Sequence, residues 1–157
     1  MKLAVIAGFV VSVLELFPFG HYHIVQVAET QPAKFAASEG VFETRPNAPL
    51  LLFGIPIDDP PEVLFPVRIP GLLSFMLHGD ADAEVRGLDA FPADELPPVL
   101  LPFVSYHTMI SLGIYFIALM GVALFLLYRG TLWKSRITLR LLLYSIPLPL
   151  LACQLGW

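Results

Sequence analysis

A long run of residues without a formal charge, 99–128, most limits what this chain can fold into. A helix needs about 20 apolar residues to cross the hydrocarbon core of a bilayer, and this run exceeds that length. The composition agrees, because 57% of the residues are hydrophobic, 14% are charged and the mean hydropathy is +0.75. We therefore expect an all-α integral membrane protein.

Two further apolar runs, residues 1–19 and 137–157, make the expected number of transmembrane helices about three. The third run contains Pro147 and Pro149, which would kink a helix in a way that a membrane bundle tolerates. Residues 129–136 then form a short turn between the second and third helices.

The first run raises two questions of interpretation. It lacks a convincing small-x-small cleavage site before Pro18, so a retained helix is favoured over a secretory signal peptide, which stays the alternative. It also contains Glu15, for which an interfacial position is favoured over a functional carboxylate inside the membrane.

Residues 20–98 form a long loop between the first and second helices, and they hold every acidic residue except Glu15. The many prolines of this loop argue against long regular elements. Its apolar patches at 50–53 and 72–77 argue against disorder, and 71–78 is expected to be a short helix on the membrane. We expect a folded cap that faces the membrane.

Charge predicts the orientation of the chain. The basic turn at 129–136 should be cytoplasmic, with Lys2 on the same side, which places the loop 20–98 outside. The net charge of −4 gives no reason to expect a nucleic acid partner. Cys153, the single cysteine, is expected to be a small apolar packing residue.

The segment 31–40 predicts a short amphipathic helix inside the loop. Pro32 suits the first helical position and Gly40 suits the stop. Lys34 and Glu39 are five residues apart, about 140° around a helix, so they form a poor intrahelical ion pair. From the residues alone, a solvated loop helix is the favoured interpretation.

Motifs along the whole chain point to one family. The pattern Gln-Pro-x-Lys-x-Ala-Ala-x-Glu-Gly at 31–40 is followed by Phe-Glu-Thr at 42–44, Leu-Phe-Gly-Ile-Pro at 52–56, Val-Arg-Gly-Leu at 85–88 and Tyr-His-Thr-Met at 106–109. Ile-Pro-Leu-Pro at 146–149 and Gly-Trp at 156–157 complete the series. This order resembles subunit I of cytochrome bd-type ubiquinol oxidases. The family's subunit is several times longer, so the chain resembles an internal piece of it.

The resemblance implies roles for four residues. Lys34 and Glu39 fall on positions for quinol binding and proton acceptance, in a quinol-binding loop. Met109 matches an axial ligand of low-spin haem b, in the setting Phe-x-x-Tyr-His-x-Met-x-x-x-Gly at 103–113. His107 lies near that haem, or is a hydrogen-bonded interfacial histidine. Without the resemblance, a methionine in an apolar helix indicates packing.

The resemblance also implies cofactors and partners. High-spin haem b and haem d of the parent would take ligands outside this chain, as would the second axial position of the low-spin haem. The expected partners are ubiquinol or menaquinol, oxidase subunit II, the rest of subunit I and lipid of the bacterial inner membrane. The parent reaction is quinol oxidation coupled to the reduction of dioxygen to water. The short loop is closest to the cyanide-insensitive branch.

Other readings of the sequence remain. His21 and His23 lack the further ligands that a metal site needs, and the acidic run 80–84 lacks the glycine and terminal glutamate of an EF-hand loop. A haem-free membrane remnant or an assembly protein is the alternative function. A transporter-like bundle that uses Glu15 and the proline-broken third helix is less favoured, because no repeat is visible.

Overall fold

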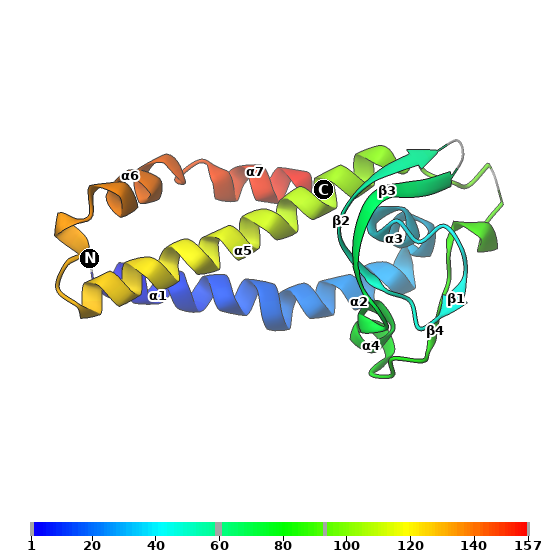
Figure 1. Ribbon diagram of the computed structural model, residues 1–157, viewed down its shortest axis with the longest axis horizontal. Helices are drawn as coiled ribbons and strands as arrows, with labels where there is room; N and C mark the ends of the chain where they lie inside the picture. Colours follow the sequence, from blue (N-terminus) through cyan, green and yellow to red (C-terminus); the bar gives the residue numbers. More distant parts are fainter. Residues whose placement is uncertain (1, 59–60, 93, 157) are drawn as a thin grey trace. The chain divides into compact units, whose positions relative to one another are not determined.

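The computed structural model describes residues 2–58, 61–92 and 94–156. The chain divides into two compact units. The helical unit comprises Met1–Gly20 and Thr108–Trp157, and the loop unit comprises His21–His107. In chain order (Figure 1), the elements are α1 (Lys2–Leu14), η1 (Glu15–Phe19), α2 (Gly20–Thr30), α3 (Pro32–Glu39), β1 (Arg45–Pro46), β2 (Leu50–Asp58), β3 (Pro61–Ile69), α4 (Leu72–His78), β4 (Glu84–Val85), η2 (Leu88–Ala90), α5 (Leu100–Tyr128), η3 (Leu132–Lys134), α6 (Arg136–Tyr144) and α7 (Leu148–Leu155).

The first helix does not stop at residue 19, where the sequence places the end of the first membrane helix. It continues through the π-helical segment η1 into α2, so that Lys2–Thr30 forms one helix of 29 residues. Pro18 has no N–H to donate, and the wider π turn absorbs it, with the Gly20 N–H donating to the Glu15 carbonyl oxygen. The added part, α2, is more polar than α1 and belongs mainly to the loop unit.

Within the described residues, two helices are long and apolar enough to cross a membrane, Lys2–Thr30 and Leu100–Tyr128. A third candidate span consists of α6 and α7, which meet at a 45° bend. Pro147 lies in the break between them. Because proline has no N–H, it cannot donate the hydrogen bond that a continuous helix requires there. Two or three candidate spans agree with the predicted membrane architecture.

The helical unit buries little of its apolar surface. In the most apolar stretch of each long helix, only 6% of the residues of Lys2–Thr30 and 11% of those of Leu100–Tyr128 are buried. Most of these side chains would therefore face lipid or further protein. Its small core contains Val5, Ala123 and Leu132. The hydroxyl of Tyr115 in α5 also lies 2.7 Å from Oγ of Ser145, beside the break between α6 and α7.

The loop unit contains a longer regular element than its prolines predict. Strands β2 and β3 form an antiparallel hairpin of nine residues on each side (Figure 1). Within the described residues, β2 and β3 pair only with each other, so each strand has one edge where a missing N–H breaks no ladder hydrogen bond. A register shift separates the pair Phe53–Val67 from the pair Ile55–Leu64, which leaves Pro66 without a partner in the ladder. The expectation that prolines exclude long elements is therefore wrong for this hairpin.

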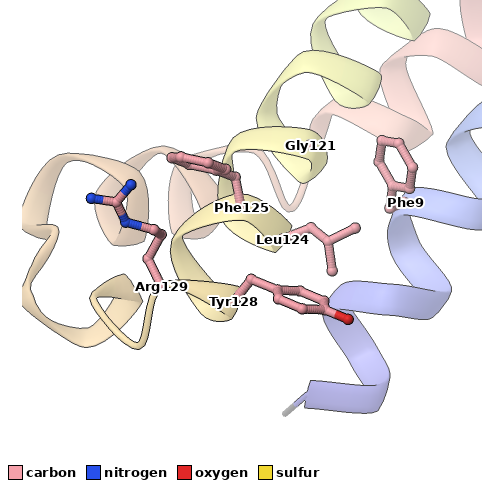
Figure 2. Close-up of a pocket in the computed structure, with 6 residues that line it drawn as sticks. All are labelled: Phe9, Gly121, Leu124, Phe125, Tyr128 and Arg129. Atoms are coloured by element: carbon pink, nitrogen blue, oxygen red, sulfur yellow. The ribbon is translucent and has the colours of Figure 1, made fainter.

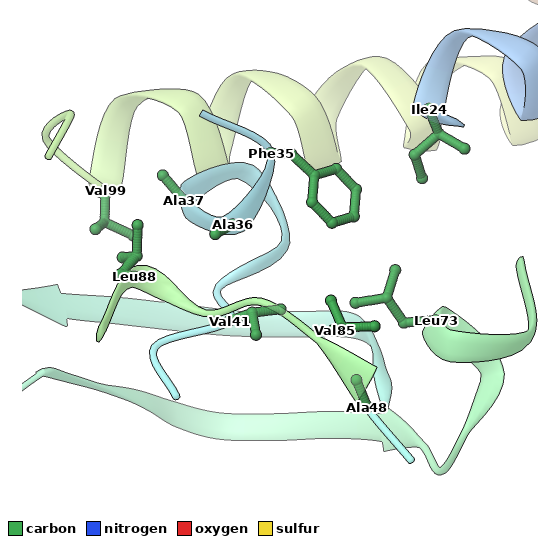
Figure 3. Close-up of a cluster of buried hydrophobic side chains, with 10 residues drawn as sticks. All are labelled: Ile24, Phe35, Ala36, Ala37, Val41, Ala48, Leu73, Val85, Leu88 and Val99. Atoms are coloured by element: carbon green, nitrogen blue, oxygen red, sulfur yellow. The ribbon is translucent and has the colours of Figure 1, made fainter. Parts of the chain in front are cut away.

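The short loop helix is where the sequence places it, but it is not solvated. Pro32 occupies the first turn of α3, and Gly40 ends the helix in the left-handed conformation with φ of 67°. Every residue from Phe35 to Glu39 is buried. Figure 3 shows Phe35, Ala36 and Ala37 within a core cluster whose other members are Ile24, Val41, Ala48, Leu73, Val85, Leu88 and Val99. The second predicted loop helix, at 71–78, is also present as α4.

Two family-like motifs, 42–44 and 85–88, come together in the loop unit. The amide and hydroxyl of Thr44 both donate to Oδ1 of Asp89, at 2.8 and 2.7 Å, and the Gly87 N–H donates to Oγ1 of Thr44 at 3.0 Å. A Cβ atom on Gly87 would lie 2.6 Å from the Thr44 nitrogen, so only glycine fits this approach. These contacts fix the chain that follows α3.

Candidate functional site

Glu39 is the most unusual polar residue of the loop unit. It ends α3 and its side chain is only 1% exposed. Oε1 accepts a 2.6 Å hydrogen bond from the Tyr106 hydroxyl. Oε2 is buried and has no hydrogen-bond partner among the described residues. Buried polar atoms are rarely left unsatisfied, and such an atom often marks a functional site.

Burial changes the acidity of this carboxyl group. Removal from water disfavours the charged form and raises the pKa of Glu39 to about 7, although the hydrogen bond from Tyr106 opposes the rise. A carboxyl group with this pKa can both accept and release a proton near neutral pH. Glu39 is therefore suited to general base chemistry.

The beginning of α5 holds the site together. Next to Tyr106, the His107 ring lies 3.0 Å from the carbonyl oxygen of Phe103 through Nδ1 and 3.0 Å from that of Leu51 through Nε2. The same ring stacks on Phe103 with centroids 4.0 Å apart. A Cβ atom on Gly40 would meet the Phe103 ring at 3.1 Å, so the end of α3 packs closely on α5. Consecutive residues of α5 thus contact α3 and β2.

Lys34 and Glu39 lie on different sides of α3, as their five-residue spacing predicts. Lys34 is exposed, whereas Glu39 is buried. The structure therefore brings Glu39, Tyr106 and His107 into one site, whereas Lys34 is exposed. The two predicted quinol residues do not share the same environment.

Met109 belongs to the helical unit and is partly buried. A Cβ atom on Gly156 would lie 2.8 Å from the Met109 sulfur, so the thioether packs closely against Gly156 and leaves no room for a side chain at that position. A methionine thioether is one of the groups that ligate haem iron in proteins, so the residue type fits the expected role. Other donors do not gather around it: within the described residues, no group of three or more His, Cys, Asp or Glu side chains could hold a metal ion.

The remaining candidates are not gathered into a site. His21, His23 and Glu15 are exposed on the first helix. In the acidic run, Oδ1 of Asp80 accepts the Asp82 N–H at 3.0 Å, which is a turn contact rather than a metal cage. Cys153 is exposed, so its predicted packing role is wrong within this chain.

A shallow apolar pocket lies in the helical unit, between α1 and α5 (Figure 2). Arg129 lies over the Phe125 ring, with 5.6 Å between the guanidinium carbon and the ring centroid. None of the predicted site residues lines this pocket, whose walls are Phe9, Gly121, Leu124, Phe125, Tyr128 and Arg129. These walls include the polar side chains of Tyr128 and Arg129 but no carboxylate or histidine.

Sequence reasoning missed the role of Tyr106. The residue is part of a family-like motif, but nothing local indicates that its hydroxyl reaches a carboxylate 67 residues earlier in the chain. The one available signal is a polar phenol, followed by a histidine, near the start of an uncharged helix.

Comparison with known proteins gives a consistent result. The family described as cytochrome bd terminal oxidase subunit I matches residues 1–157. The chain is similar to two proteins of Bacillus subtilis. It is 34% identical to one provisionally named cytochrome bd menaquinol oxidase subunit I, and 30% identical to cytochrome bd ubiquinol oxidase subunit 1. These alignments cover 100% and 99% of this chain, but 35% of each relative.

A solved structure agrees with these relatives. The bd oxidase from Geobacillus thermodenitrificans has a chain that is 31% identical, with a TM-score of 0.87. The match covers 99% of this chain and 36% of that one. The chain thus spans about a third of the length of the proteins it matches.

Proposed function

Because the chain belongs to the family of cytochrome bd terminal oxidase subunit I, we propose that it forms the quinol-oxidising part of such an oxidase. The names of its relatives include both a menaquinol and a ubiquinol oxidase, so the substrate class is a quinol. Its electrons would pass through haems to dioxygen, which is reduced to water. The buried carboxylate of Glu39, with one oxygen unpartnered among the described residues, is the observation that carries this proposal.

Glu39 acts as the proton acceptor. A quinol loses two protons and two electrons when it becomes a quinone. The pKa of Glu39, raised to about 7 by burial, allows the carboxylate to take a proton from one hydroxyl group and then release it before the second transfer. Lys34, on the exposed side of α3, binds or polarises a quinol oxygen as the molecule enters.

Met109 would hold a low-spin haem b through its thioether sulfur. Such a haem, when bound, supplies a one-electron acceptor whose reduction potential is raised by methionine ligation. The sulfur packs against Gly156, where a side chain would not fit. A histidine ligand for the same haem, and the ligands of high-spin haem b and haem d, would come from outside this chain.

The apolar helices and the charge of the segment between them support a membrane arrangement for this chain. The two or three candidate spans cross the bacterial inner membrane, with the basic segment 129–136 on the cytoplasmic side and the loop 20–98 outside. Oxidase subunit II, the rest of subunit I and membrane lipid cover the apolar surface that the helical unit leaves exposed.

The test compares two carboxylate variants of the oxidase complex that contains this chain. Glu39→Gln should slow oxygen consumption with quinol by about 100-fold or more, because the base is lost, and should spare oxygen consumption with an artificial electron donor. Glu95→Gln removes an exposed carboxylate of the same loop and should leave both rates unchanged. Equal loss of both rates in Glu39→Gln would contradict the proposed role.

A second variant tests the haem ligand. Met109→Leu should remove the low-spin haem b signal from the reduced-minus-oxidised absorption spectrum and leave membrane insertion intact. An unchanged spectrum would overturn the ligand assignment. Absence of every haem signal from the unaltered complex would instead favour a haem-free membrane protein.

A further inference from the structure

The two oxygen atoms of Glu39 have different surroundings. Oε1 accepts the 2.6 Å hydrogen bond from Tyr106, whereas Oε2 is buried without a partner among the described residues. A buried oxygen without a donor is costly, so the native site should gain a donor when a ligand binds. A quinol hydroxyl group is a donor of the required kind.

The orientation of this carboxylate is fixed from outside its own helix. Tyr106 lies on α5, 67 residues after Glu39. The adjacent His107 contacts the carbonyl oxygen of Leu51 at 3.0 Å, and this contact holds the start of α5 against β2. Gly40 ends α3 immediately after Glu39 and packs on Phe103 of α5. The Tyr106 hydroxyl is thus a fixed donor rather than a mobile one.

We propose that Tyr106 is a positioning residue, which holds Oε1 of Glu39 and so presents Oε2 to the hydroxyl group of a bound quinol. This inference rests on the proposed function of Glu39. The Tyr106 hydroxyl donates its single hydrogen to Oε1.

The same bond decides where the proton is placed. When the quinol O–H bond breaks, the proton forms a new O–H bond at Oε2, and the electron leaves to a one-electron acceptor, which the proposed haem would supply. A protonated carboxyl group keeps a carbonyl oxygen that still accepts a hydrogen bond. Tyr106 therefore remains bonded to Oε1 in both states, and Glu39 does not rotate between proton uptake and release.

The test is Tyr106→Phe in the oxidase complex, which keeps the ring and removes only the hydroxyl group. The kcat with quinol should fall about tenfold, as expected for the loss of one hydrogen bond made to a reacting group, while oxygen consumption with an artificial donor stays unchanged. In infrared difference spectra, the protonated carboxyl band that Glu39→Gln abolishes should move to higher wavenumber, because its carbonyl has lost a hydrogen bond.

Tyr115→Phe is the matched control. It removes a hydroxyl from the same helix that bonds Ser145 instead, and it should change neither the quinol rate nor the carboxyl band. Tyr106→Phe with an unshifted band and the parent kcat would overturn the inference. Equal loss of activity with the artificial donor would also overturn it. A normal quinol rate in Glu39→Gln would overturn the proposed function itself, and this outcome is distinct from both.

Discussion

The Nε2 atom of His107 lies 3.0 Å from the carbonyl oxygen of Leu51, and this contact ties α5 to the hairpin strand β2. Nδ1 of the same ring contacts the carbonyl oxygen of Phe103, within α5. Both partners are carbonyl oxygens, which only accept hydrogen bonds, so a neutral ring donates to one of them at a time. His107 is thus a structural contact of the loop unit, whatever further part it takes beside a haem.

His107→Phe tests this contact. The variant keeps a ring that can stack on Phe103 but removes the bond to Leu51, so the hairpin should lose about 1 kcal/mol of local stability. Hydrogen–deuterium exchange of the β2 and β3 amides should become faster, while exchange in α4 stays as it was. Unchanged protection of the hairpin would mean that the Leu51 contact stabilises nothing.

Much of this fold could be predicted from local patterns. The charge-free run 99–128 predicts α5, and Pro32 and Gly40 predict both ends of α3, because proline and glycine act through their own backbone geometry. The hairpin could not be predicted in this way. Its prolines are tolerated because, in the part of the chain that the structure describes, each strand has an unpaired edge, which only the tertiary arrangement supplies.

The candidate site likewise has one part that the local sequence predicts and one part that depends on tertiary contacts. The motif at 31–40 identifies Glu39, but α3 packs into a core whose members, such as Leu73, Leu88 and Val99, lie far away in the chain. The partner of its carboxylate, Tyr106, comes from another element altogether. The sequence alone therefore favours a solvated helix, because most of the residues that pack against α3 come from distant segments of the chain.

The raised pKa of Glu39 predicts that the loop unit becomes less stable as the pH rises. The folded state holds the proton more tightly than the unfolded chain, whose pKa is near 4.5. The stabilising contribution is therefore complete below pH 4.5 and is lost as the pH rises to about 7. The whole loss amounts to about 3 kcal/mol.

This loss can be measured by hydrogen–deuterium exchange of the amides of α3 at pH 5 and pH 8, after correction for the intrinsic exchange rates. Glu39→Gln, which cannot ionise, should show the same protection at both values. A parent protein whose corrected protection is independent of pH would contradict the raised pKa.

Gly156→Ala tests the close packing of Gly156 against the Met109 thioether. The added methyl group would lie 2.8 Å from the Met109 sulfur, closer than van der Waals contact, so the thioether must move. The low-spin haem b band of the complex should shift or weaken. Gly121→Ala is the control, because its methyl group would meet Phe9 at an ordinary 3.5 Å. Identical spectra for the two variants would show that Met109 is not constrained at Gly156.

The most direct test of the account is the single-turnover rate at which quinol reduces the low-spin haem in Glu39→Gln. The account predicts a normal haem spectrum, full reduction by dithionite, and reduction by quinol that is slower by about 100-fold or more. Reduction by quinol at the rate of the unaltered oxidase would contradict it, because the quinol would then lose its protons without Glu39.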